Sequence, residues 1–299
     1  DFQFIAEARA DRLQEEDYFL LKKAGFHIIQ TGIESFSPHY IKKMSKGVRV
    51  IDNIAALKHS RQYQIKNEYN LIINYPNEEP IDFIESEKTI QLFKQYLNPP
   101  RISPFIVSYQ SHIYKNLRKY NISDIIPKNI DKLLYSNEFI ENAELFFYDF
   151  KRITNIEPQK WEQIVSTWNS IRKKQKIKTV QTGNIIDDLI FYYEDGGSFL
   201  KIYDKRNLKD VNIYMLDEHE REVFLSCKDI ICRDRLIQNL NWISEQKIDQ
   251  ILSDLVENNI IFKEDDSYIS LPLCLRTYLG FNHPLDLHEK KAKSILLQK

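Results

Sequence analysis

Two short isoleucine-rich runs, each closed by polar or turn-forming residues, constrain the fold of this chain more than any other feature. The first lies within residues 25–35 and the second covers residues 68–76. A buried parallel strand has this form, because it is apolar along most of its length and delivers functional side chains at its carboxyl end. We therefore expect any functional site to lie where these two runs end.

The first part of the chain alternates predicted strands with predicted helices. Ser37 and Pro38 have the residue types of a helix N-cap and first helical position, and Gly47 is a stop signal. Such alternation is typical of parallel β/α units, and four strands in roughly 110 residues make about half of an eight-stranded barrel. The predicted strands are 2–9, 26–33, 67–73 and 102–109, and the predicted helices are 15–24, 37–46, 50–62 and 80–97.

The pattern changes after residue 110. An aromatic cluster at 145–150 precedes a helix at 157–176, whose tryptophans and isoleucines recur at the spacing of a core-facing stripe. Residues 187–194 and 198–204 read as a hairpin. Helices at 217–227, 233–240 and 244–258, followed by strands at 260–263 and 267–271, have the order of a winged helix. We predict domains at 1–110, 111–210 and 211–275, with a helical tail at 285–299 inside the segment 276–299.

Composition disfavours several classes of function. The 299 residues have a net charge of −1 and only seven glycines, so neither broad attraction to nucleic acid nor a glycine-rich phosphate loop is expected. The helix at 244–257 has one lysine against four acids, which disfavours DNA and favours a peptide-binding or structural role. There is no apolar run near the roughly 18 residues of a membrane-spanning helix. We expect a cytoplasmic protein that binds neither DNA nor membranes.

Histidines and cysteines do not predict a metal site. The seven histidines share no ligand spacing, and the three cysteines make neither a disulfide framework nor a four-ligand zinc site. Cys227 and Cys232 read as helix-packing residues, with a redox or metal pair as the less favoured alternative. The basic run at 172–178 is typical of a solvated helix end.

The predicted strand ends supply the candidate ligand-binding residues. Acidic and amide side chains that point to the same opening of a barrel suit a ligand with hydroxyls and an amino group. The alternative is that Glu34 and Arg9 form an ion pair with each other and bind no ligand. Gly32 lies inside a strand, where glycine marks close approach by a ligand or by backbone. The candidates are Glu7, Arg9, Gln30, Gly32, Glu34, Asn70 and Asn74, with Ser103 and Ser108 read more loosely from the last strand.

Several segments together resemble the second half of the radical S-adenosylmethionine (SAM) barrel: residues 7–11, 20–25, 30–35, 44–47 and 70–78. Residues 97–105, 202–206 and 268–271 resemble the branch of that superfamily that matures ribosomally made peptides. Many members of this branch also carry a cobalamin domain and methylate carbon. The implied fold is α/β, the C-terminal half of a (β/α) radical SAM barrel followed by an α+β region and a winged-helix-like module.

The resemblance also implies roles for individual residues. Glu7 matches a position whose polar side chain meets the SAM ribose. Gly32 and Glu34 match a glycine-and-acid motif in which the glycine lets adenine pack closely and the acid anchors the loop. Asn70 begins the strand near the adenine edge, and Arg9 is placed to reach the SAM carboxylate. Gln30 belongs to the same motif, and no catalytic residue is assigned.

The chain departs from the family at its iron–sulfur motif. The sequence Cys-x-x-x-Cys-x-x-Cys is absent, and Cys227, Cys232 and Cys274 cannot replace it. The chain begins at Asp1 with a predicted strand whose edge would be unprotected. We expect this chain to be a fragment of a longer protein whose missing N-terminal half binds the [4Fe–4S] cluster. The alternatives are that a separate chain supplies this half, or that the protein is a degenerate relative of the family.

The leading hypothesis is the C-terminal portion of a radical SAM enzyme that modifies a precursor peptide, with C-methylation and cobalamin as the finer assignment. The fragment alone should be inactive. One alternative is a non-radical β/α-barrel enzyme that uses Glu7 and Glu34 as acid and base. Another is a non-enzymatic peptide-binding partner that uses residues 210–275.

Overall fold

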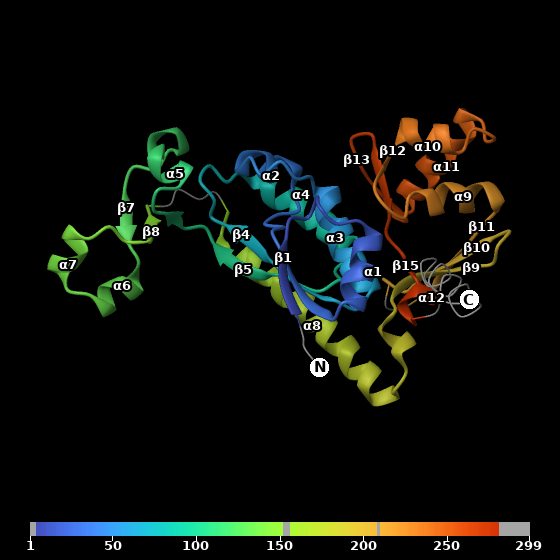
Figure 1. Ribbon diagram of the computed structural model, residues 1–299, viewed down its shortest axis with the longest axis horizontal. Coiled ribbons are helices and arrows are strands. Elements are labelled where there is room, and N and C mark those ends of the chain that lie inside the picture. The colour runs from blue at the N-terminus through green and yellow to red at the C-terminus, as the bar shows by residue number, and fades with distance from the viewer. Residues whose placement is uncertain (1–3, 152–155, 208–209, 281–299) are drawn as a thin grey trace, which may run out of the picture.

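A computed structural model describes residues 4–151, 156–207 and 210–280 (Figure 1). Its first part alternates parallel strands with helices, which confirms the predicted α/β class. The elements are β1 (Phe4–Ala8), α1 (Glu15–Lys23), β2 (Phe26–Thr31), α2 (Pro38–Met44), α3 (Val50–Gln62), β3 (Lys66–Glu68), β4 (Asn70–Ile73), α4 (Pro80–Gln91) and β5 (Arg101–Pro104).

These strands are all parallel, but they belong to two separately hydrogen-bonded sheets. Strands β1, β2 and β3 form a sheet in that order, and β4 pairs with β5. A parallel bridge between Glu34 and Leu71 connects the two sheets. The predicted strand 67–73 is thus interrupted at Tyr69, whose buried ring places its hydroxyl to donate to the Asn98 carbonyl at 2.6 Å.

Local capping signals position the helix after β2. The Ser37 hydroxyl accepts the N–H of Tyr40 at 3.0 Å, and Pro38 is the first helical residue, as predicted. The helix ends earlier than predicted, at Met44, because Ser45 adopts the left-handed conformation with φ of 53°. The stop therefore precedes Gly47.

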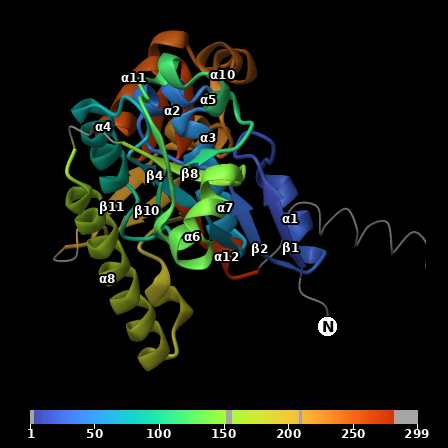
Figure 2. The same cartoon turned by 90° about the vertical axis from the view of Figure 1, so that its left-hand side faces the viewer.

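Residues 105–150 form a small lobe beyond the ends of β4 and β5, separate from the C-terminal elements (Figures 1 and 2). Its antiparallel sheet has the order β6–β8–β7 and its own core, which includes Val107, Ile122 and Tyr148. The predicted strand 102–109 is wrong as a single element, because β5 and β6 belong to different sheets. The elements are β6 (Val107–Ser108), α5 (His112–Lys115), the 3₁₀ helix η1 (Leu117–Tyr120), β7 (Ile125–Pro127), α6 (Asn129–Leu134), α7 (Asn137–Asn142) and β8 (Phe147–Phe150).

The long helix α8 (Pro158–Thr182) leads to a four-stranded sheet in the order β11–β10–β9–β15. The predicted hairpin is present, but its first strand begins only at Phe191 because residues 185–188 form a 3₁₀ turn. Strand β11 was not predicted. The elements are η2 (Ile185–Asp188), β9 (Phe191–Asp195), β10 (Leu200–Asp204) and β11 (Asn212–Leu216).

The last described elements follow the predicted order of helices and strands, with a three-stranded sheet β12–β14–β13. Their classification as a winged helix, like the domain boundaries, stays a prediction. The predicted tail helix 285–299 lies outside the described residues. The elements are α9 (Glu218–Ser226), β12 (Ile231–Cys232), α10 (Arg233–Asn239), α11 (Glu245–Glu257), β13 (Ile261–Glu264), β14 (Ser267–Ser270), β15 (Leu273–Cys274) and α12 (Leu275–Tyr278).

One hydrophobic core runs from Ile33 to Tyr278 and joins the parallel strands, α8 and the C-terminal elements. Helix α3 lies at its centre, and every residue of α3 except Arg61 is buried. No helix in the described ranges is long and apolar enough to span a membrane.

Replacement of Trp168 by alanine should destabilise this core strongly. Trp168 is fully buried, its ring centroid lies 5.5 Å from that of Phe93, and its indole N–H donates to the Leu97 carbonyl at 2.9 Å. Loss of the ring should lower the free energy of unfolding by about 3–5 kcal/mol. Urea denaturation measures this loss, with Val180→Ala on the exposed side of α8 as the control. Equal urea midpoints for the Trp168→Ala and Val180→Ala variants would contradict the packing of Trp168 in this core.

Candidate functional site

Side chains from neighbouring strands form a polar row on one face of the parallel sheet. Glu7 pairs with Gln30 across β1 and β2, and Gln30 pairs with Glu68 across β2 and β3. Register partners in a parallel sheet point to the same face. Glu7 and Gln30 are exposed, whereas Ile29 and Thr31 on the opposite face are buried. The sheet is therefore covered on one face and open on the other.

The end of β2 contacts the strands on both of its sides. The Gly32 N–H donates to the Ala8 carbonyl at 3.3 Å, and the Glu34 N–H donates to the Asn70 carbonyl at 3.1 Å. Asn70 begins β4 rather than ending a strand, but the stagger of the strands places Glu34 alongside it. The structure thus brings together Glu7, Arg9, Gln30, Gly32, Glu34 and Asn70, on adjoining positions of β1, β2 and β4.

Three side chains in this group have unused hydrogen-bonding capacity. Within the described ranges, the side chains of Glu7, Gln30 and Asn70 have no hydrogen-bond or ion-pair partner. A carboxylate accepts hydrogen bonds, and an amide both donates and accepts them. This set complements a ligand that carries hydroxyls and an amino or ring-nitrogen edge, which is the chemistry of a nucleoside.

Glu34 forms an ion pair with Lys46 rather than with Arg9. Lys46 Nζ lies 2.5 Å from Glu34 Oε1 and 3.4 Å from the Gly32 carbonyl, and a Cβ atom on Gly32 would lie 3.2 Å from the same ammonium. Arg9 instead pairs with Asp11 at 2.9 Å and donates to the Lys46 carbonyl at 3.1 Å. The alternative Glu34–Arg9 pair is therefore wrong, and Glu34 anchors the loop that follows β2.

Glu34 also has an unusual backbone conformation, with φ of 64° in the left-handed region that non-glycine residues rarely adopt. Its N–H and carbonyl are both used, the latter accepting the Ile72 N–H at 2.8 Å. These two bonds and the Lys46 pair hold the residue in place. Sequence reasoning found Glu34 but not Lys46.

A second cluster at the same sheet edge was missed. His39 Nδ1 lies 2.6 Å from Asp82 Oδ1, and Asp82 is fully buried. The ligand atoms of His39, Glu79 and Asp82 lie within 4.8 Å of one another, a set able to hold a metal ion. The Lys43 ammonium lies 2.7 Å from Glu79 and 2.8 Å from Asp82, so this lysine already supplies a positive charge to both carboxylates.

The sequence carried a signal for this cluster. His39 and Asp82 each lie in the first turn of the helix that follows a parallel strand, which places both near the carboxyl edge of the sheet. The histidines show no ligand spacing, because His39 and Asp82 are too far apart in the chain to share a motif.

A buried acid holds the turn that follows β4. The two carboxylate oxygens of Glu78 accept the Asn74 N–H and the Trp161 indole N–H, each at 3.1 Å. Burial raises the pKa of Glu78 to about 6 from its ordinary value of 4.5, and these hydrogen bonds only partly oppose the shift. Both oxygens are occupied by the protein, so Glu78 is a positioning residue rather than a ligand-binding one.

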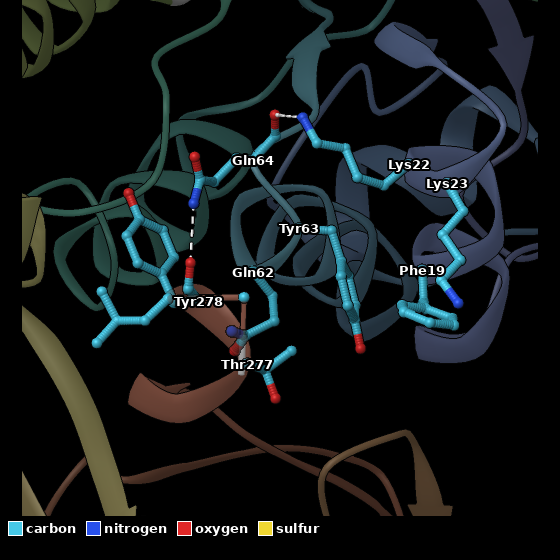
Figure 3. A pocket seen from close by; sticks show the side chains of 10 residues that line it. Phe19, Lys22, Lys23, Gln62, Tyr63, Gln64, Thr277 and Tyr278 are labelled. Carbon is cyan, nitrogen blue, oxygen red and sulfur yellow. Dashed lines mark hydrogen bonds between the residues drawn. The ribbon is translucent and has the colours of Figure 1, made fainter. Parts of the chain in front are cut away.

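A cavity of about 390 Å³ lies at the other end of the strands (Figure 3). It is lined by the C-terminal turns of α1 and α3 and by α12. Lys22 donates to the Gln64 carbonyl at 3.1 Å, and the Gln64 amide donates to the Tyr278 carbonyl at 2.8 Å. Because α1 and α3 end just before β2 and β3 begin, this cavity lies at the amino ends of the strands and is separate from the polar row.

No protein-family model matches this sequence, and no curated protein matches it. Among solved structures, the chain is similar to Elp3 of Methanocaldococcus infernus, at 15% identity over 67% of this chain and 52% of that one, with a TM-score of 0.33. It is similar to the radical SAM methyltransferase TsrM of Kitasatospora setae, at 12% over 56% and 36%, with a TM-score of 0.33.

The coproporphyrinogen III oxidase HemN of Escherichia coli, a radical SAM enzyme, is similar at 11% identity over 90% of this chain and 66% of that one, with a TM-score of 0.34. The chain thus has structural similarity to radical SAM enzymes at low identity. It spans about half of the Elp3 chain and about a third of the TsrM chain.

Glu78→Gln should remove a pH dependence of stability. Because the folded pKa is raised to about 6, the folded chain binds this proton more tightly than the unfolded chain does. The resulting stabilisation, on the order of 2 kcal/mol, is complete below the unfolded pKa and is lost as the pH rises through 6. Urea midpoints measured between pH 4.5 and 7 should fall for the native sequence relative to the variant.

The matched control is the exposed Glu79→Gln. Lys43 holds the pKa of Glu79 below its ordinary value, so that residue contributes a dependence of opposite sign, lost as the pH falls. Parallel pH profiles for the native chain and Glu78→Gln would show that Glu78 is not desolvated as described.

Proposed function

We propose that the parallel sheet is one wall of a SAM-binding (β/α) barrel, and that the whole protein is a radical SAM enzyme acting on a ribosomally made peptide. C-methylation is the proposed modification. The observation that carries the proposal is that Glu7 and Gln30 of the polar row pair on the open face, with Asn70 at the start of β4 alongside Glu34. The side chains of Glu7, Gln30 and Asn70 have no partner among the described residues. The residue-by-residue match of these positions to the barrel motif supports the same assignment.

The exposed face of the sheet supports the proposal that the sheet is part of a barrel rather than a sheet that is complete in itself. Parallel sheets are ordinarily covered on both faces. Here helices bury one face, while on the other Ile5 is 68% exposed in line with Glu7. A second set of strands over this face would enclose the polar row and exclude water from a bound nucleoside.

The residues present fit SAM in their chemistry. The Glu7 carboxylate accepts hydrogen bonds from the ribose hydroxyls, and the Gln30 and Asn70 amides both donate to and accept from the adenine edge. The Lys46–Glu34 pair fixes the loop after β2 and places the Lys46 ammonium 3.2 Å from the position that a Cβ atom on Gly32 would take. Reductive cleavage of bound SAM, with one electron from a cluster held outside the described residues, would supply the radical that removes hydrogen from an unactivated carbon of the peptide.

The described cysteines do not fit an iron–sulfur cluster. Cys227 is buried, with its pKa raised to about 12 by burial, whereas Cys232 is exposed and Cys274 pairs its backbone with β9. A cluster needs thiolates that converge. We therefore propose that the cluster ligands lie outside these residues, and the same is proposed for a cobalamin site.

Acid–base catalysis by Glu7 and Glu34 is less well supported. Lys46 Nζ lies 2.5 Å from Glu34 Oε1, so this carboxylate is already engaged by the protein. Glu7, by contrast, is exposed and has no partner within the described ranges that would tune it for proton transfer. A ligand-binding role for both residues agrees better with their surroundings.

Replacement of the polar row should weaken SAM binding. Isothermal titration of the chain with SAM should show that Glu7→Ala and Asn70→Ala each raise Kd about tenfold, because each removes one hydrogen-bonding group worth about 1.4 kcal/mol. The control is Glu16→Ala, an exposed glutamate on α1. The absence of binding by the native chain, or equal Kd values for all variants, would refute the proposed site.

The cluster has its own test. The reading frame that precedes Asp1 should encode Cys-x-x-x-Cys-x-x-Cys, and the protein made from that longer frame should bind iron and cleave SAM under reducing conditions. A longer frame without this motif would refute radical chemistry while leaving SAM binding as a separate question.

A further inference from the structure

Large apolar side chains are exposed along a short stretch of the lobe. Leu133 and Phe146 are 81% and 82% exposed, values expected for unfolded chain rather than for a packed surface. Contiguous exposed apolar surface on a folded protein marks an interaction site. We call this surface the lobe patch, and its members are Ile126, Ile130, Leu133, Leu134, Tyr135, Phe139, Phe146 and Phe147.

The patch residues lie on neighbouring elements of the lobe. Helices α6 and α7 contact each other, and the rings of Tyr135 and Phe139 stack with centroids 4.8 Å apart. Lys128, just before α6, places its ammonium 5.8 Å from the Phe147 ring of β8. The buried core of the lobe lies around Val107, so the patch residues are additional to the residues that form this core.

The charge beside the patch is mainly negative. Residues 126–150 contain two lysines, Lys128 and Lys132, against five acids: Asp131, Glu138, Glu141, Glu144 and Asp149. Glu144 accepts the Tyr109 hydroxyl, whereas Glu138 and Glu141 have no ion-pair partner in the ranges that the structure describes. The complementary occupant is therefore apolar and positively charged.

The lobe is attached at the sheet edge that carries the candidate site. The Phe105 N–H donates to the Ile73 carbonyl at 2.8 Å, and the rings of Phe105 and Tyr75 lie 4.8 Å apart. The Asn121 amide donates to the Asn77 side chain at 2.8 Å in the turn after β4. The lobe thus joins the sheet beside the carboxyl ends of β4 and β5, whereas helices α6 and α7 lie at the far end of the lobe, away from these strands (Figure 1).

We propose that the lobe patch docks a basic, apolar segment of the peptide substrate, at a distance from the residue that reacts at the polar row. This inference rests on the proposed function for the identity of the peptide as substrate. A second copy of the chain fits less well, because symmetric pairing would bring Glu138 and Glu141 near their own equivalents. An anionic membrane is disfavoured by the same charges.

The test measures fluorescence anisotropy of two labelled peptides against the full chain. One peptide alternates leucine with lysine, and the other has glutamate in place of lysine. The lysine peptide should bind, and the glutamate peptide should bind at least about tenfold more weakly. The double variant Leu133→Ser/Phe146→Ser should weaken binding of the lysine peptide about tenfold or more. Val180→Ser, equally exposed at 83% on α8, should leave it unchanged.

A second variant tests the charge. Glu138→Gln/Glu141→Gln should lower the affinity for the lysine peptide and reduce its dependence on salt, while circular dichroism and the urea midpoint stay the same. Equal binding by the native chain and the double serine variant would overturn the proposal. So would patch-dependent binding to vesicles of neutral lipid, or patch-dependent dimerisation, without binding of the lysine peptide.

SAM titrations on the same samples separate this proposal from the proposed function. The lobe variants should keep the native Kd for SAM, because none of them touches the polar row. Loss of patch-dependent peptide binding with SAM binding intact would overturn only the docking proposal. Peptide binding without SAM binding would instead refute the proposed function and leave the patch as a peptide site.

Discussion

The buried polar groups of helix α3 hold the first part of the chain to the C-terminal elements. Lys58 is buried and donates to the Lys228 carbonyl at 2.8 Å and to the Ser270 hydroxyl at 3.2 Å, while burial lowers its pKa to about 8. At the other end of the helix, Glu264 accepts the Ile51 N–H at 2.6 Å. A buried charge without such partners would be costly, so both parts must fold against α3 together.

This constraint explains why the sheet is one-sided. Because α1 covers Ile29, and α3 with its C-terminal partners covers Leu71, the polar strand residues lie on the other face. The parallel strands then align their carboxyl ends at one edge, where the turns after β2 and β4 and the lobe are attached. The polar row and the His39–Asp82 cluster are two consequences of the same arrangement.

Much of the candidate site followed from strand ends alone. Glu7 and Gln30 were found because parallel strands present their last polar residues together, and Gly32 because a glycine inside a strand needs a reason. What the sequence did not indicate was the partner of each residue. Lys46 lies a helix away from Glu34, and Asp82 lies two helices away from His39. The His39–Asp82 pair exists only because α2 and α4 pack side by side, and the Glu34–Lys46 pair only because the chain returns to the end of β2 after α2.

The sequence by itself determined the local elements. The cap at Ser37, the limits of α3 at Val50 and Gln62, and the strand–helix alternation depend on residues a few positions apart. The tertiary structure alone decided the interruption at Tyr69, the division of residues 102–109 between two sheets and the burial of Lys58. These features depend on hydrogen bonds and packing between residues distant in the chain, and such contacts acquire an energy only when folding has brought both partners together.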